Sequence, residues 1–371
     1  MKKFLFLFFI LFSVIACKGP SGTTDNKQAG DTTVVEPDTA FTALFRRNCC
    51  GFTGGDGTYS VRLPDGRTVW IFGDTFVGKV YPDSSRERRN PIYIRNSFVV
   101  QDGDSLHTLY HHVNGKDASE IIFPYEEKDM KPATFTEDSA WFWPGDGLIE
   151  NGKLKVFLSS FIQADTGMWG FKWTGTWLAT FSLPGMVLDS LYKIPYSLTN
   201  QVHYGHAVCE GNDFTYIYGA GEGRPYVARY AAGNVDGPWT FYDGGQWSGD
   251  PLQTKPMGDF HVSEQFSVSH IGNRYVLISQ EGMLSNEIYS YVSDNPYGPW
   301  DQRTLIYKTP IPEGSTTIFT YNALAHPEFL NADGLLVSYN MNSSVLEEHF
   351  KNADIYRPRF IRVPLKLIDR E

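Results

Sequence analysis

Beyond residue 40 the apolar positions fall into short runs and do not follow the three-to-four-residue spacing of helices. The runs are rich in Val, Ile, Phe, Tyr and Trp, and Gly, Asn, Asp and Pro separate them. β-Branched and aromatic residues favour strands, whereas the separating residues favour turns. The pattern therefore predicts an all-β fold with almost no helix.

One pattern recurs five times: a polar start, an extended segment, a glycine turn and a strongly apolar strand. The copies begin at Gly54, Pro144, Tyr204, Val262 and Tyr321. Their turn glycines are Gly66, Gly152, Gly211, Gly272 and Gly334. Most copies follow one another at roughly 60 residues, enough for a four-stranded propeller blade. We therefore predict a five-bladed β-propeller over residues 41–371, with a two-sheet sandwich as the alternative.

Residues 1–16 have the organisation of a secretory signal peptide. Two lysines precede an unbroken apolar run, Phe4 to Phe12, which is shorter than the roughly 20 residues that span a bilayer. The run leads to an Ala-Cys pair that is similar to the lipobox of bacterial lipoproteins, so Cys17 is the expected lipidation site. Residues 17–40 are polar and small, as in a flexible tether. The sequence predicts a cell-envelope lipoprotein anchored in the outer membrane, on its periplasmic or surface face.

Composition excludes one class of partner and leaves others open. The net charge of −10 argues against nucleic acid, whose phosphates select basic surfaces. Aromatic residues make up 15% of the chain, which fits sugar binding. If Cys17 is lipidated, three of the four cysteines remain, and an odd number does not indicate a disulfide framework. No Cys or His spacing typical of a metal site is present, so we expect no metal, no cofactor and a monomeric protein.

Propeller geometry would bring the beginnings of the first strands to one end of a central channel, here called the mouth. The five copies place these residues at that position: Asp56, Asp146, His206, Glu264 and His326. Ionisable side chains around one pocket supply what acid–base chemistry requires. These residues are therefore candidates for the site, although polar residues also begin strands for structural reasons.

The first copy contributes a second carboxylate, Asp74, at the end of a strongly apolar strand. Asp56 and Asp74 flank Gly66, so a hairpin about that glycine would bring them to the same end. Opposed residues on paired strands have Cβ atoms about 4.5–5.5 Å apart. Two acids this close perturb each other's pKa and are candidates for catalysis. The structural alternative is that Asp74 binds backbone amides at a strand end.

Three motifs resemble furanosidase-type glycoside hydrolases, a class of five-bladed propellers. They are GGDGTYSV from Gly54, WIFGDTFVG from Trp70 and RNSFVV from Arg95. Together the motifs are most similar to bacterial endo-D-arabinanases, which act on arabinan of the mycobacterial cell-wall type.

This resemblance implies roles for particular residues. Asp56 and Asp74 would be the catalytic pair, and Arg95 would contact the substrate. The familiar arabinanase triad of Asp, Asp and Glu, drawn from three blades, would instead select Asp56, Asp146 and Glu264. The two assignments share Asp56 and differ in the rest.

These features predict a glycoside hydrolase that cleaves a furanoside polysaccharide, with arabinan of the D-arabinan type as the expected substrate. Trp143 and Tyr204 each lie shortly before a mouth residue and are candidates for stacking on sugar rings. A non-catalytic carbohydrate-binding lipoprotein is the alternative, and a scaffold that binds another protein is a third. The paired carboxylates favour the hydrolase, because sugar binding alone does not require two adjacent acids.

Overall fold

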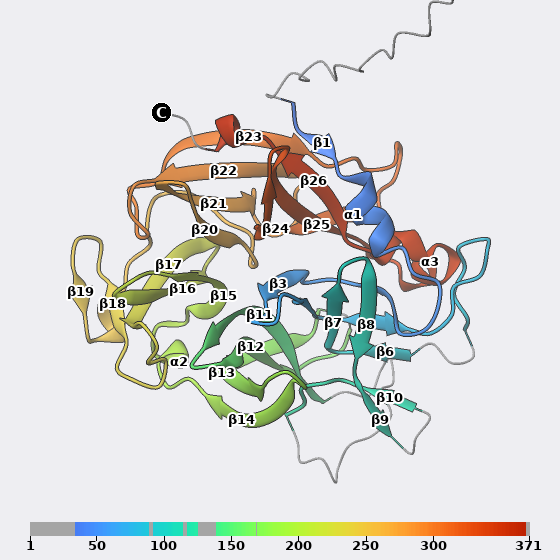
Figure 1. Ribbon diagram of the computed structural model, residues 1–371, viewed down its shortest axis with the longest axis horizontal. Helices are drawn as coiled ribbons and strands as arrows, with labels where there is room; N and C mark the ends of the chain where they lie inside the picture. Colours follow the sequence, from blue (N-terminus) through green and yellow to red (C-terminus); the bar gives the residue numbers. More distant parts are fainter. Residues whose placement is uncertain (1–33, 89–91, 114–116, 125–138, 168, 369–371) are drawn as a thin grey trace, which may run out of the picture. The chain divides into compact units, whose positions relative to one another are not determined.

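The computed structural model describes residues 34–88, 92–113, 117–124, 139–167 and 169–368 (Figure 1). All of them belong to one compact unit, Thr33–Glu371. The predicted signal peptide, the predicted lipidation site and most of the predicted tether lie outside the described residues. Within the described ranges, none of the helices has the length and apolar character needed to cross a membrane.

Five antiparallel sheets dominate the fold, which is all-β as predicted (Figure 1). Sheet 1 contains β3 (Tyr59–Arg62), β4 (Thr68–Phe72), β7 (Ser97–Asp102) and β8 (Ser105–Leu109). Sheet 2 contains β11 (Ala140–Glu150), β12 (Lys153–Gln163), β13 (Phe171–Ser182) and β14 (Val187–Lys193). Sheet 3 contains β15 (His203–Glu210), β16 (Phe214–Gly221), β17 (Arg224–Ala231), β18 (Thr240–Tyr242) and β19 (Trp247–Ser248).

The last two large sheets follow the same order. Sheet 4 contains β20 (Ser267–Ile271), β21 (Arg274–Gln280), β22 (Glu287–Ser293) and β23 (Asp301–Lys308). Sheet 5 contains β24 (Ile318–Asn331), β25 (Gly334–Ser343), β26 (Arg359–Val363) and β1 (Glu36–Pro37). In each sheet the first two strands form the hairpin that the glycine-turn pattern predicted.

Smaller elements complete the described chain. Two short sheets are formed by β2 (Phe52–Gly55), β5 (Thr75–Val77) and β6 (Ile92–Ile94), and by β9 (His111–Val113) and β10 (Asp117–Ser119). The helices are α1 (Thr39–Leu44), α2 (Ser197–Asn200) and α3 (Leu346–Lys351). The single-turn 3₁₀ helices are η2 (Pro251–Gln253), η3 (Ala353–Tyr356) and η4 (Leu365–Leu367).

The first strands of the five large sheets contact one another in sequence. β3 contacts β11, β11 contacts β15, β15 contacts β20, β20 contacts β24, and β24 contacts β3. These contacts bring together strands that are far apart along the chain. Residues near the beginnings of the first strands are therefore able to share one site.

Sheet 5 joins the two ends of the described chain. Strand β1 pairs with β26, with Glu36 opposite Arg362 (Figure 1). Asp38 accepts a hydrogen bond from Phe41 N at 2.9 Å, which caps α1, and a second from Arg362 Nε at 2.9 Å. The ordered fold thus begins before residue 41, the predicted boundary. Backbone pairing and capping hold this short segment, and Val35 packs against the apolar core cluster of sheets 4 and 5.

An aromatic cluster fastens the segment after α1 to sheets 1 and 5. Phe45 is fully buried. Its ring centroid lies between 5.0 and 6.0 Å from those of Phe52, Trp70, Phe72 and Phe360. These partners belong to β2, β4 and β26, so Phe45 ties the first sheet to the last.

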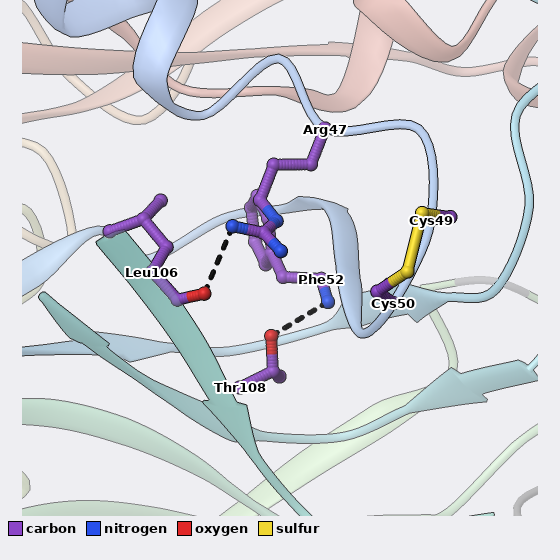
Figure 2. The surroundings of a disulfide bond; sticks show 6 residues. All are labelled: Arg47, Cys49, Cys50, Phe52, Leu106 and Thr108. Atoms are coloured by element: carbon purple, nitrogen blue, oxygen red, sulfur yellow. Dashed lines mark hydrogen bonds between the residues drawn. A yellow bond between two sulfur atoms is a disulfide. The ribbon is translucent and has the colours of Figure 1, made fainter. Parts of the chain in front are cut away.

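Two of the three cysteines in the described residues are paired. Cys49 and Cys50, which are neighbours in the chain, form a disulfide on an exposed loop (Figure 2). Two residues later the chain returns to the sheets, where Phe52 N donates to Thr108 Oγ1 at 2.8 Å. Cys209 is buried and free. The disulfide joins adjacent residues, so it staples one turn and forms no framework between distant parts of the chain.

We predict that Phe45→Ala lowers the free energy of unfolding by about 3–5 kcal/mol, because it removes a buried ring and leaves a cavity. The matched control is Val187→Ala on β14, whose side chain is 64% exposed and whose loss changes stability by less than about 0.5 kcal/mol. Urea unfolding followed by tryptophan fluorescence measures both. Equal effects of the two substitutions would contradict the role given to the cluster.

Candidate active site

Asp56 and Asp74 lie side by side at the open end of the β3–β4 hairpin. Asp56 N donates to Asp74 O at 3.2 Å, and Gly73 N donates to Asp56 O at 2.8 Å. At the other end of the hairpin, Gly66 N donates to Leu63 O at 3.0 Å and closes the turn. The structure therefore brings the two carboxylates together, as the hairpin argument expected.

Two glycines make room for this close approach. A Cβ atom on Gly73 would lie 2.9 Å from Asp56 Oδ1, and one on Gly55 would lie 3.0 Å from Asp74 O. Both distances are shorter than ordinary contacts between carbon and oxygen. The glycines in the two motifs thus have a steric role, because larger residues would separate the two acids.

Asp74 is surrounded by donors from several parts of the chain. The Tyr93 hydroxyl donates to Asp74 Oδ2, and Trp143 Nε1 donates to Oδ1 at 2.9 Å. The Arg95 guanidinium lies 3.4 Å from both oxygens and stacks over the Trp141 ring at 4.3 Å. Asp74 itself is 8% exposed. Both oxygens of this buried carboxylate therefore accept hydrogen bonds, which fix its orientation.

Asp56 has a different environment. It accepts a hydrogen bond from the Tyr321 hydroxyl, which in turn accepts one from Asn342 Nδ2 at 2.9 Å. Burial and the neighbouring charge of Asp74 raise the pKa of Asp56 to about 7, against the lowering effect of hydrogen bonds from Tyr321 and Tyr356. An unperturbed aspartic acid has a pKa of about 3.9. Asp56 can therefore carry a proton near neutral pH.

Asp146 lies in a β-bulge of β11 and binds backbone amides. Its Oδ1 accepts from Gly147 N at 2.8 Å, and its Oδ2 accepts from Val208 N on β15 at 2.8 Å. Burial raises the pKa of Asp146 to about 7, against the effect of these amide hydrogen bonds. Both oxygens are thus engaged in joining sheets 2 and 3, which favours a structural role.

Glu264 forms a cluster with two histidines of sheet 3. His203 Nδ1 and His206 Nε2 both contact Glu264 Oε1, the latter at 3.2 Å. Burial works to raise the pKa of Glu264, but the hydrogen bonds from the two imidazoles outweigh it and lower the pKa below its usual range. The Trp173 ring stacks on His203 with a centroid distance of 3.9 Å. These three ligand-type side chains could hold a metal ion, which the sequence spacing did not suggest.

His326 does not belong to the mouth, contrary to the prediction. It is fully buried, and its ring nitrogens contact Ser60 Oγ at 2.5 Å and Ser338 Oγ at 2.8 Å. Burial and the charge of Arg362 lower the pKa of His326 to about 3. The bulge of β24 lies between Tyr321 and Leu324, so the repeat position of sheet 5 falls before His326. The prediction chose the wrong residue of β24 because the sequence does not show where a bulge occurs.

The two predicted stacking aromatics have different positions. Tyr204 is 1% exposed and packs against Trp239 and Phe241, so it is a core residue and offers no face to a sugar. Trp143 is half-buried, and its indole N–H contacts Asp74. Arg95, expected to contact substrate, also faces Asp74.

Several residues around the acids had no signal in the sequence. Tyr93 and Tyr321 reach the two carboxylates from β6 and β24, and His203 reaches Glu264 from β15. Each is an ordinary strand residue in its own segment. Only the His-x-x-His spacing of His203 and His206 was visible, and in a regular strand it would place the two rings on opposite faces.

This fold and site define an all-β protein with a pair of adjacent carboxylates, one buried and one half-buried, that residues of several sheets contact. The chain belongs to the DUF5005 family, described as a domain of unknown function, whose model matches residues 38–365. A comparison with curated proteins gives no match.

Solved structures provide further similarity. A Bacteroides ovatus ATCC 8483 protein, described provisionally as a hydrolase, is 25% identical, with a TM-score of 0.77 over 91% of this chain and 92% of that one. The GH43 protein BlXynB of Bacillus licheniformis is 13% identical, with a TM-score of 0.49 over 80% of this chain and 50% of that one. A Xanthomonas citri GH43_1 enzyme complexed with xylose is 15% identical, with a TM-score of 0.44 over 89% and 90%. The last two similarities are too low to support a conclusion.

We predict that Asp56 makes the protein less stable as the pH rises from about 4 to about 7. Its pKa is raised in the fold, so the folded protein retains a proton that the unfolded chain releases in this window. Asp56→Asn should remove this loss and gain stability relative to wild type as the pH rises. Urea unfolding across the window measures the difference, with the exposed Asp333→Asn as control. An unchanged pH dependence in Asp56→Asn would contradict the assignment.

Proposed function

We propose that this protein is a glycoside hydrolase that cleaves a furanoside polysaccharide, and that its substrate is arabinan of the D-arabinan type. The observation that carries the proposal is the pair of adjacent acids, Asp56 and Asp74, in unlike environments. Glycosidic cleavage requires one protonated acid and one ionised carboxylate. The hydrolase description of the Bacteroides ovatus protein, 25% identical over 91% of this chain, supports the class of reaction. The motif resemblance supports the substrate.

The two environments suggest separate roles. Asp56, whose pKa is raised to about 7, donates its proton to the leaving oxygen. Asp74, oriented by Tyr93 and Trp143, attacks the anomeric carbon and forms a glycosyl-enzyme ester. Asp56 then removes a proton from water, which attacks the same carbon and releases Asp74. Two displacements at one carbon retain its configuration, the outcome expected when the two acids are adjacent.

The three-blade triad is less well supported than the pair. It would require Asp146 and Glu264 to act on substrate. Both oxygens of Asp146 accept backbone amides, and Glu264 is engaged by two imidazoles. The pair is favoured over the triad because its two acids are adjacent, and because burial and the charge of Asp74 raise the pKa of Asp56.

We further propose that the five sheets are the blades of a five-bladed β-propeller. The support is the order of contacts among the first strands, which returns from β24 to β3. The pairing of β1 with β26 in sheet 5 would then fasten the two ends of the propeller together. This arrangement would place the carboxylate pair at the mouth.

The proposed location is the cell envelope, with a lipid anchor at Cys17 in the outer membrane and the protein monomeric. The motif that ends in Ala16-Cys17 supports this location. A lipid-anchored hydrolase would act on polysaccharide at the periplasmic or outer surface.

We predict that Asp56→Asn and Asp74→Asn each reduce turnover by about three orders of magnitude while the protein still folds. Wild-type kcat/KM should fall as the pH rises above about 7, because Asp56 then loses its proton. The assay is reducing-end release from a panel of arabinans, fructans and galactans, with Asp333→Asn as control.

Two other outcomes of this assay would favour one of the alternatives. Polysaccharide binding without release of reducing ends by wild type would favour the carbohydrate-binding alternative. Retained activity in both Asn variants, together with its loss in Asp146→Asn or Glu264→Gln, would favour the triad.

We also predict that Cys17→Ala moves the protein from the membrane fraction to the soluble fraction, because stable anchoring depends on the acyl chains. Ser21→Ala, four residues further along, is the matched control and should remain in the membrane. Immunoblots of fractionated cells measure the distribution. A Cys17→Ala protein that stays membrane-bound would show that the anchor lies elsewhere.

A further inference from the structure

Three side chains of sheets 3 and 4 converge on one point. His203 Nδ1, His206 Nε2 and a carboxylate oxygen of Glu264 all lie within 4.8 Å of one another. Both imidazoles contact the same oxygen, Oε1. Neither Asp56 nor Asp74 is part of this cluster, so its properties do not depend on the proposed hydrolysis.

We propose that His203, His206 and Glu264 bind a divalent transition-metal ion of the zinc class. Two imidazoles and one carboxylate are ligands typical of zinc, whereas calcium and magnesium prefer oxygen ligands alone. Zinc bonds to nitrogen and oxygen are about 2.0–2.2 Å long, which places the ligand atoms of a tetrahedral site about 3.3–3.5 Å apart. The distance of 3.2 Å from His206 Nε2 to Glu264 Oε1 is close to this value. His203 Nδ1 lies closer to the same oxygen, so binding an ion would require that pair to move apart.

A β-bulge in β15 places both histidines on one face. In a regular strand, residues three apart point to opposite faces. Between Tyr204 and Ala207 the pairing with β16 shifts and leaves Gly205 and His206 without partners on β16, so the regular alternation is interrupted, and both imidazoles reach Glu264. Gly205 allows the bulge, since its φ is +100° and a Cβ atom there would lie 2.4 Å from Phe157 Cβ. The backbone is therefore shaped to bring His203 and His206 together.

Part of the cluster is packed against other side chains, and part of it is exposed to solvent. His206 is 3% exposed, and His203 is stacked under Trp173. The side chain of Glu264 is 38% exposed and that of His203 is 25% exposed. An ion could thus reach the cluster from solvent, and three protein ligands leave a coordination position for water.

The cluster lies near the acid pair. Gln265, the residue after Glu264, has its Oε1 3.6 Å from the position of a Cβ on Gly57, the residue after Asp56. The residues that follow Glu264 and Asp56 therefore approach each other.

The competing explanation is a metal-free ion pair in which the histidines only balance the charge of Glu264. The two explanations differ in what purified, tag-free protein binds. We expect isothermal titration to show one zinc ion per chain, and cobalt(II) to give the visible absorption bands of a site with nitrogen and oxygen ligands. Calcium at the same concentrations should give no heat from this cluster.

Substitutions test the ligands. Glu264→Gln and His203→Gln should each weaken zinc binding by at least about 100-fold and abolish the cobalt bands. The matched controls, Glu281→Gln and His270→Gln, lie on sheet 4 or its edge outside the cluster and should bind zinc as wild type does. Absence of stoichiometric zinc binding by wild type, or unchanged binding in both cluster variants, would overturn the proposal.

A stability measurement on wild type tests the site even if the cluster variants fold poorly. Zinc should raise the unfolding midpoint of wild type, and a chelator should reverse the increase, because an ion that binds only the folded state stabilises it. The control variants should show the same shift. A midpoint that does not respond to zinc in wild type would count equally against the site.

Discussion

Two carboxylates held side by side by main-chain hydrogen bonds are the constraint on which the rest of the site depends. Asp56 and Asp74 cannot both be buried as anions without a large electrostatic cost. The protein meets this constraint by leaving a proton on Asp56 and supplying donors to Asp74. The donors come from β6 and β11, and Tyr321 of β24 reaches Asp56. The pair is thus a product of the assembled sheets, and no single hairpin could stabilise it.

Glycines at bulges set how closely neighbouring sheets approach. A Cβ atom on Gly145 would lie 2.1 Å from Gly205 O, so the bulges of β11 and β15 are in backbone contact. At these bulges Asp146 turns toward the amides of Gly147 and Val208, and His206 turns toward Glu264. Bulges at matching positions therefore have different results. In sheet 2 the bulge residue Asp146 binds the main chain of sheet 3, and in sheet 3 the bulge residue His206 joins the cluster with Glu264.

The local sequence pattern was sufficient to predict the hairpins, which depend on interactions between residues close together in the chain. Alternating apolar strands and turn glycines specify the hairpins, because strand pairing across a tight turn involves only neighbouring residues. The adjacency of Asp56 and Asp74 followed for the same reason, since both belong to one hairpin. The resemblance of the motifs around them indicated the same two residues.

Contacts between distant segments were decided only by the tertiary structure. A bulge moved the repeat register of β24, so His326 became a core residue. Tyr204 became one by packing against Trp239 and Phe241. The ordered start at β1 depends on a partner, β26, that lies at the other end of the chain. His203 gained Glu264 from another sheet. In each case the sequence determined the strand, and packing against remote strands determined which way its side chains point.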